Sequence, residues 1–418
     1  MAAVKRRKPE NKKIEAGRHE MDYTFLFLII LLACCGLVML LSASTPAANV
    51  KMNNSYYFFS RQLGYVAVGV CGMLVISNIK YDIYKKLAVP IMAICFIMLV
   101  LVAIPGIGKE FNGSRRWLGT ESFQIQPSEF MKPALAIYFA FLLDREKKDM
   151  TKFGSSIKYL SVLFALLICM MLEPHLSGAI ILVGIGMVML IVSGFSIRPV
   201  VVLGATVSPF LLAYLYFFDN VRWARIASFI DPFHDVQGKS YQIVQSLYAI
   251  GSGGVFGKGL GESMQKYSFL PEPYNDFIFA VICEELGLLG AAAIIILFAL
   301  FIYHGIKIAL RAPDTFSMLT ATGIVSQVGI QTILNIAVAT SSIPCTGVSL
   351  PFFSYGGTAL CILLMELGIL LNISRYTKNQ ESVFSYFKGK ENVLTYMKAG
   401  MRKAFKRRNK SVQRRIEK

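Results

Sequence analysis

Ionisable side chains inside or beside long apolar segments are the residues of this sequence best suited to chemistry. A charge placed in lipid costs at least ~2.5–3.5 kcal/mol on insertion scales, so a membrane-embedded charge usually has a function. Most of the polar set falls near the ends of apolar segments, at Arg115, Arg116, Glu129, Lys132, Glu173, His175, Lys266, Glu272 and Asp276. Glu284 and Glu285 lie deeper in an apolar segment, and Glu366 stands alone in the last one.

The stretch Leu270-Pro-Glu-Pro-Tyr-Asn-Asp276 places one carboxylate at the start of an apolar helix. Pro271 and Pro273 break helical structure before it. An aspartate in this place could cap the helix by accepting backbone N–H bonds. The same carboxylate, held at a water–lipid boundary, could act as a general base or bind a divalent cation. The two interpretations are compatible.

A second polar cluster contains Arg116, Trp117, Glu129 and Lys132. Glu129 and Lys132 are three residues apart and therefore share one helix face. They could form an ion pair that allows a spanning helix to begin. Alternatively, Arg116 and Lys132 could form a cationic seat for phosphate, with Lys266 as a weaker candidate cation.

Two glycine-rich segments have different predicted roles. Gly356 and Gly357 favour close helix packing, while Ser354 and Tyr355 could line a polar groove. The run 251–261 lacks the preceding strand that a dinucleotide-binding loop needs, so we expect no organic cofactor. The cysteines form no CxxC pair and the histidines are scattered, which argues against a zinc site.

Long apolar segments must position these groups. Of 418 residues, 55% are hydrophobic and 16% charged, whereas a soluble domain carries about 25% charged residues. A disordered chain requires low hydrophobicity, so disorder is excluded as well. We predict an all-α, polytopic membrane bundle of about ten spanning helices. The apolar runs cover residues 23–44, 62–79, 87–105, 128–143, 158–172, 176–194, 198–218, 276–303, 316–340 and 350–372.

The charge distribution predicts that both termini are cytoplasmic. The basic tails, residues 1–22 and 375–418, carry net charges of +3 and +11. With the N-terminus inside, 32 of the 43 Lys and Arg residues fall on the inner side, as the positive-inside rule requires. Eight spans would also be even in number, if the fifth and sixth runs formed a re-entrant pair around Glu173 and His175. The tails would contact anionic lipid, and no motif supports nucleic-acid binding.

The domain organisation follows from these spans. Residues 23–374 form the predicted transmembrane catalytic domain between the two tails. Its largest extracytoplasmic loop, residues 219–275, joins the seventh and eighth spans and is rich in glycine and aromatic residues. Long ordered loops are usually functional, so we expect short interfacial helices folded over the mouth of the bundle.

Together, these motifs resemble the SEDS (shape, elongation, division and sporulation) family. The matching strings are Gly113-x-x-Arg116-Trp117, Gln126-Pro-Ser-Glu129-x-x-Lys132, Tyr241-Gln-x-x-Gln245-Ser, Ala249-Ile-Gly-Ser-Gly-Gly254, Gly259-Leu-Gly-x-Ser263-x-Gln265-Lys266, Leu270-Pro-Glu272, Asp276-Phe-Ile-Phe-Ala280, Glu284-Glu-Leu-Gly287, Pro344-x-Thr-Gly347 and Leu350-Pro-Phe-x-Ser354-Tyr-Gly-Gly357. The basic N-terminal tail and Leu371-Asn-Ile-Ser-Arg375 resemble the FtsW/SpoVE branch more than RodA.

The resemblance implies a peptidoglycan glycosyltransferase of the bacterial plasma membrane with its active site on the extracytoplasmic side. It would polymerise lipid II into β-1,4-linked strands and release undecaprenyl diphosphate, in division or sporulation. It implies a class B penicillin-binding transpeptidase as partner, beside lipid II, the nascent glycan and other divisome or elongation proteins. Asp276 matches the family's essential aspartate and could hold Mg²⁺ or Mn²⁺. The predicted substrate-binding residues are Arg116, Trp117, Glu129, Lys132, Lys266, Glu272, Ser354 and Tyr355.

Several positions depart from the family pattern. His175 stands where the family often has aspartate, Tyr274-Asn275 replaces a frequent His-Thr, and Glu366 is an unusual charge in the tenth span. Two other functions stay open: a flippase or transporter for lipid-linked sugars, and a non-catalytic scaffold that recruits the transpeptidase. The deep carboxylates Glu284, Glu285 and Glu366 have no evident cationic partner in the sequence, which counts against a polar transport path.

Overall fold

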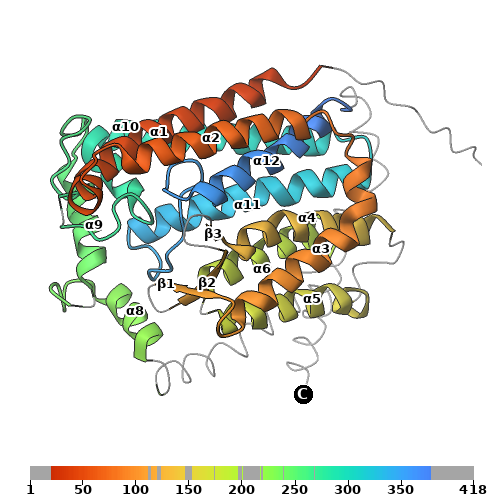
Figure 1. Ribbon diagram of the computed structural model, residues 1–418, viewed down its shortest axis with the longest axis horizontal. Helices are drawn as coiled ribbons and strands as arrows, with labels where there is room; N and C mark the ends of the chain where they lie inside the picture. Colours follow the sequence, from red (N-terminus) through yellow and green to blue (C-terminus); the bar gives the residue numbers. More distant parts are fainter. Residues whose placement is uncertain are drawn as a thin grey trace, which may run out of the picture.

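The computed structural model describes residues 20–111, 114–119, 124–145, 153–173, 175–195, 200, 217, 220–238, 240–267 and 269–377. The long helices lie side by side, and their axes are roughly aligned (Figure 1). The helices are α1 (Tyr23–Met52), α2 (Tyr57–Ile76), α3 (Asp82–Ala103), α4 (Pro127–Arg145), α5 (Phe153–Leu172), α6 (Leu176–Val192), α8 (Asn220–Ile230), α9 (Tyr241–Ser252), α10 (Ile278–Leu310), α11 (Thr315–Ala339) and α12 (Gly357–Ser374).

The mainly helical membrane architecture is confirmed. Six helices, α1, α2, α3, α10, α11 and α12, are long and apolar enough to cross a membrane, and α5 and α6 contain shorter apolar helices. α4 has a weak apolar signal because it carries Glu129, Lys132, Asp144 and Arg145. The predicted seventh span, 198–218, lies outside the described residues apart from 200 and 217, so the count of ten spans stays a prediction. The basic tails also lie outside, apart from residues 20–22 and 375–377.

One predicted span boundary was wrong and one predicted span contains a break, because hydropathy does not report backbone geometry. Residues 350–356, the predicted start of the last span, form turns, and α12 begins only at Gly357. α10 is interrupted at Gly287, whose φ of 67° and ψ of −167° are not helical. A Cβ at Gly287 would lie 2.3 Å from the backbone nitrogen of Gly257, so this close approach requires glycine.

A small antiparallel sheet corrects the all-α prediction. It consists of β1 (Lys109–Phe111), β2 (Ser114–Gly119) and β3 (Gln124–Ile125), in the order β1-β2-β3. The segment between α3 and α4 has no long apolar run, so hydropathy gave no signal for these strands. β2 carries Arg116 and Trp117, and this sheet therefore positions the first half of the predicted polar cluster.

Hydrogen bonds between residues that flank the helices show which helix ends lie together. The backbone nitrogen of Asp22, before α1, donates to the Ser374 hydroxyl at the end of α12 (3.1 Å). The Tyr81 hydroxyl, before α3, donates to Asp314, before α11 (2.6 Å). The start of α1 and the end of α12 are therefore on the same side, as an even number of crossings requires. α8 and α9 lie toward the opposite end (Figure 1).

Glycines bring α2 and α12 into close contact. A Cβ at Gly69 would lie 2.7 Å from a Leu364 methyl, and one at Gly368 would lie 2.5 Å from the Met73 carbonyl oxygen. Small residues allow such backbone approach in membrane helices. The prediction placed this packing at Gly356 and Gly357, and it is confirmed at Gly357, where a Cβ would overlap the Tyr65 ring of α2. At Gly356 the nearest side chain is that of Ala359 in α12 itself. The segment 219–275 contains the two short helices expected there, α8 and α9, and α9 packs against α10 and α11.

Candidate active site

Asp276 lies in the turn immediately before α10. The N-cap position is Phe277, and no side chain caps this helix end, so the capping interpretation of Asp276 was wrong. The Asp276 carboxylate instead lies against Gly347, where an added Cβ would be 3.1 Å from Oδ2. Gly347 has a φ of 67°, a conformation that glycine adopts easily. The carboxylate is thus available to a ligand rather than used by the helix.

Asn335 of α11 holds the Asp276 turn in place. Its Nδ2 donates to the carbonyl oxygens of Asp276 (2.8 Å) and Val348 (2.7 Å), and its side chain is buried. Asn335 therefore joins the turn to the segment that contains Gly347. Asn335 was not predicted from the sequence, although an amide side chain inside an apolar run is a signal of such a role.

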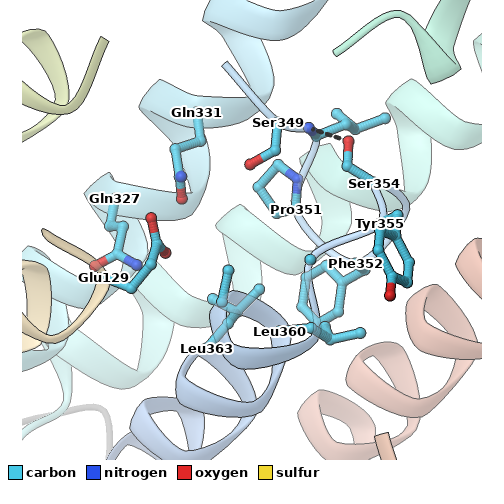
Figure 2. Close-up of a pocket in the computed structure, with 13 residues that line it drawn as sticks. Glu129, Gln327, Gln331, Ser349, Pro351, Phe352, Ser354, Tyr355, Leu360 and Leu363 are labelled. Carbon is cyan, nitrogen blue, oxygen red and sulfur yellow. Dashed lines mark hydrogen bonds between the residues drawn. The ribbon is translucent and has the colours of Figure 1, made fainter. Parts of the chain in front are cut away.

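Ser354 and Tyr355 join the other flank of the turn. The Ser354 hydroxyl donates to the Asn275 carbonyl oxygen (2.6 Å), and the Tyr355 backbone nitrogen donates to the Tyr274 carbonyl oxygen (2.8 Å). Ser354 also accepts a hydrogen bond from the Leu350 nitrogen (2.7 Å; Figure 2). The Ser354 hydroxyl is therefore engaged within the protein, and substrate binding by Ser354 and Tyr355 stays a prediction.

Two arginines and one glutamate set the electrostatics at Asp276. Burial and then the negative charge of Glu272 raise the pKa of Asp276 to about 6, and Arg116 and Arg225 oppose this rise. Arg116 reaches the Glu173 carbonyl oxygen from β2 (3.5 Å), and Arg225 of α8 reaches the Cys345 carbonyl oxygen (3.4 Å). Asp276 can therefore exchange a proton near neutral pH beside positive charge. Arg225 was not predicted, because nothing in the sequence near it indicates proximity to Asp276.

Glu129 and Lys132 form a buried ion pair on α4. Lys132 Nζ donates to both carboxylate oxygens of Glu129 (2.7 and 2.8 Å), and the lysine is only 2% exposed. The ion-pair interpretation is confirmed. The Lys132 ammonium is already neutralised by the Glu129 carboxylate, so the geometry does not support Lys132 as an open binding site for phosphate.

An open pocket lies beside Glu129 of this ion pair (Figure 2), with about 370 Å³ of empty space that includes space open to solvent. Its polar wall is formed by Glu129, Gln327, Gln331 and Ser349. The rest of the lining comprises Leu350, Pro351, Phe352, Ser354, Tyr355, Gly356, Ala359, Leu360 and Leu363. Asp276 is not part of this lining. Ser354 and Tyr355 line the pocket and also bond to the residues before Asp276, so the segment 349–356 contacts both the pocket and the turn.

Lys266 lies in a different cluster and not beside Asp276. Its Nζ donates to Glu285 (2.8 Å), the Gly261 carbonyl oxygen (2.6 Å) and the Ser42 hydroxyl (3.1 Å). Nearby, Lys258 pairs with Glu284 at 2.6 Å. The geometry thus assigns Lys266 a structural partner, and the expectation that the deep carboxylates have no cationic companions was wrong for Glu284 and Glu285. Both lysines come from the loop that folds over α10.

Glu173 and His175 occupy the connection between α5 and α6. Burial raises the pKa of Glu173 to about 8, and Arg116 opposes this rise. Neither carboxylate oxygen of Glu173 has a hydrogen-bond partner among the described residues. Burial, together with Arg116 and Lys132, lowers the pKa of His175 to about 3. At neutral pH both side chains are therefore uncharged, and His175 lies within the influence of both cations.

The remaining predicted residues have less specific environments. Trp117 lies on β2, half-buried, in register with Lys109 of β1. Glu272 accepts a hydrogen bond from Asn275 Nδ2 (2.6 Å). Within the described ranges, no group of three or more His, Cys, Asp or Glu side chains is placed to hold a metal ion. A cation at Asp276 would therefore need further oxygen ligands, such as backbone carbonyls, water or oxygens of a substrate.

Comparison with known proteins gives a consistent family. Residues 22–379 match the profile of the FtsW/RodA/SpoVE cell cycle proteins. The chain is 43% identical over 359 residues to stage V sporulation protein E of Bacillus subtilis, which covers 85% of this chain and 98% of that protein. It is 39% identical over 361 residues to a probable peptidoglycan glycosyltransferase FtsW of Geobacter metallireducens, with 85% and 95% covered.

Solved structures agree on the fold. One chain, from work described as "Structural coordination of polymerization and crosslinking by a peptidoglycan synthase complex", matches with a TM-score of 0.73 at 23% identity, covering 85% of this chain and 98% of that one. The rod shape determining protein RodA of Thermus thermophilus matches with a TM-score of 0.64 at 24% identity, with 86% and 98% covered.

Proposed function

The chain belongs to the FtsW/RodA/SpoVE family of cell cycle proteins, and we propose that it is a peptidoglycan glycosyltransferase that polymerises lipid II. The product is a β-1,4-linked glycan strand, and undecaprenyl diphosphate is released. The observation that carries the proposal is the placement of Asp276, in a turn fixed by Asn335, with a pKa near neutral and with Arg116 and Arg225 acting on it.

The chemistry requires a base and a cationic leaving-group site. An α-linked diphosphate becomes a β-glycoside through a single inversion, in which the acceptor's sugar 4-hydroxyl attacks the anomeric carbon. Asp276 accepts the hydroxyl proton as the new C–O bond forms. The bond to the diphosphate breaks, and its electron pair stays on the leaving oxygen. Arg116 and Arg225 stabilise the charge that develops there.

This assignment revises the predicted substrate contacts. Arg225 takes the place that the sequence gave to Lys132 and Lys266, because both lysines are held in buried ion pairs. Glu272 acts mainly by raising the pKa of Asp276, which keeps the base near the working pH. Trp117, Ser354 and Tyr355 remain proposed contacts for the sugar or stem of the substrate.

The membrane arrangement and the partner belong to the same proposal. We propose ten spans, with both termini in the cytoplasm and the Asp276 turn on the extracytoplasmic side of the bacterial plasma membrane. The common location of Asp22 and Ser374 supports an even number of spans. A class B penicillin-binding transpeptidase is the proposed partner, supported by the resemblance of the fold to a chain from a peptidoglycan synthase complex.

A divalent cation is proposed as an assisting group. Asp276 and Glu272 would hold it together with diphosphate oxygens, and it would neutralise negative charge on the substrate. Chelation by EDTA should then lower polymerisation, and Mg²⁺ or Mn²⁺ should restore it. Full activity in EDTA would remove the metal from the proposal and leave the role of Asp276 unchanged.

The deciding experiment is a gel assay of lipid II polymerisation by the purified chain, with and without the transpeptidase. The parent should form a glycan ladder, and Asp276→Asn should not. Asp231→Asn is the matched control, because Asp231 is an exposed carboxylate in the same large loop. Equal polymerisation by the parent and Asp276→Asn would refute the catalytic role.

The same assay separates the two alternatives. A flippase needs two compartments, so polymer formation in detergent micelles supports the enzyme. The cations beside Glu284 and Glu285 remove one argument against transport. These cations, Lys258 and Lys266, are held in ion pairs with the two glutamates and are not spaced along a path. A scaffold would support growth when it carries Asp276→Asn, and the enzyme would not.

A further inference from the structure

Glu366 is a buried carboxyl group in the middle of α12. Its side chain is 3% exposed, and its Oε1 accepts a hydrogen bond from Gln327 Nε2 of α11 (2.7 Å). Glu366 Oε2 and Gln327 Oε1 are both buried and have no hydrogen-bond partner among the described residues. Two buried acceptor oxygens therefore lie in one place without donors. Buried acceptors nearly always receive a hydrogen bond, so these two oxygens indicate that the site holds an additional hydrogen.

The charge around Glu366 leads to the same conclusion. The charged groups that act on it are Lys132, attractively, and Glu129, repulsively, both from α4. Lys132 is already bound by both oxygens of Glu129. The cluster thus contains two carboxyl groups for one ammonium. A second buried anion without its own cation is strongly unfavourable, because burial removes its hydration and no opposite charge replaces it.

Neighbouring helices supply no further cation. α2 faces α12 with Gly69, Gly72 and other small or apolar residues. In the described part of the chain, no charged group of α2 or α10 is among those that act on Glu366. α11 contributes only the neutral amide of Gln327. The simplest neutral state of the cluster is an ionised Glu129–Lys132 pair beside a protonated Glu366.

We propose that Glu366 holds a proton at neutral pH and is a positioning residue for the Lys132–Glu129 pair. While Glu366 is neutral, Lys132 has a single anionic acceptor and stays on Glu129. When Glu366 loses its proton, Lys132 has two carboxylates to choose between, and its hold on Glu129 weakens. Glu129 and Gln327 both line the 370 Å³ pocket, so this change alters the charge that the pocket presents.

The kinetic consequence rests on the proposed function. A substrate that occupies the pocket should bind more weakly as alkaline pH removes the proton from Glu366. For the parent enzyme we expect the KM for lipid II to rise about threefold or more between neutral and alkaline pH, with kcat little changed, because ground-state binding is affected. Glu366→Gln keeps a neutral, hydrogen-bonding group there and should abolish this rise.

Infrared spectroscopy tests the proton without any activity assay. The purified parent at neutral pH should show the carbonyl band of a protonated carboxylic acid that is absent from Glu366→Gln. Glu173 should give a second such band, which Glu173→Gln removes and Glu366→Gln keeps. If Glu366→Gln leaves every protonated-carboxyl band intact, Glu366 is ionised and the proposal is wrong, whether or not the chain polymerises lipid II.

The kinetic arm uses matched variants. Glu262→Gln removes an exposed carboxylate from the large loop and should keep the alkaline rise in KM. Gln327→Met removes the hydrogen-bond partner of Glu366 and should move the alkaline rise to a different pH. An identical pH dependence of KM in the parent and Glu366→Gln would overturn the positioning role, even with the infrared band present.

Discussion

Replacing Asp276 by asparagine should separate catalysis from stability, because the two effects have opposite signs. The variant removes the base, and general-base assistance typically contributes ~10²–10⁴-fold to rate. That range corresponds to about 3–5 kcal/mol of barrier. The same variant also removes a partly buried charge. It should therefore be less active and, at alkaline pH, more stable than the parent.

The magnitude of the stability gain follows from the pKa. The Asp276 pKa rises from 3.8 to about 6 on folding. The folded state therefore binds the proton more tightly than the unfolded state, and stability falls as the pH rises through this window. A two-unit shift is worth ~3 kcal/mol at most, and partial exposure reduces this to ~1–2 kcal/mol. The penalty is complete above pH 6 and absent below about pH 4.

Thermal unfolding in detergent at two pH values measures this effect. At pH 8 we expect Asp276→Asn to melt higher than the parent by roughly 1–4 °C for a chain of this size. The difference should shrink as the pH falls toward 4. Asp231→Asn should change neither activity nor melting temperature. A variant that is inactive and also melts lower at pH 8 would show that Asp276 supports the fold, and the base assignment would lose its basis.

Three further predictions concern the surroundings of Asp276. In pH–rate profiles, Glu272→Gln should move the acid limb to lower pH, because it removes a negative charge that raises the pKa of Asp276. Arg116→Gln should move the acid limb to higher pH, because it removes a positive charge that lowers this pKa. Shifts in the same direction would contradict the electrostatic account. Asn335→Leu leaves one buried and one part-buried carbonyl oxygen without this donor, so chemical denaturation should show a loss of ~2–4 kcal/mol. A loss under ~0.5 kcal/mol would disprove the bridging role of Asn335. Gly347→Ala crowds the Asp276 carboxylate, so gel assays should show a rate loss of about tenfold or more. It also strains a residue with positive φ, so the variant should be ~1 kcal/mol less stable. Activity equal to that of the parent would show that the contact is unimportant.

Apolar runs and isolated charges predicted much of the architecture and the position of Asp276 just before a long helix. The run 316–340 corresponds closely to α11, and the prolines before Asp276 correctly indicated a turn. The break at Gly287 could not be predicted in the same way, because it depends on the loop residue Gly257 approaching the backbone. Hydropathy averages over a window and carries no information about such a contact.

The partners of charged residues were the least predictable part of the site. Lys132 and Glu129 share a helix face, so their ion pair was accessible from spacing alone. Lys266 and Glu285 are separated by a turn and a helix, and only the folded loop brings them together. Arg225 reaches the site because α8 folds back toward the segment that contains Cys345. Long-range pairing of this kind needs the tertiary structure.

The interruption at Gly287 also affects how the position of Asp276 depends on the thickness of the surrounding bilayer. Residues 288–310 amount to ~34 Å of helix, which alone is enough to cross the ~30 Å hydrocarbon layer. The preceding stretch, Ile278–Glu285, is buried on every side and is therefore held by protein contacts. A thinner or thicker bilayer can therefore tilt residues 288–310, while Ile278–Glu285 and the Asp276 carboxylate before it keep their positions.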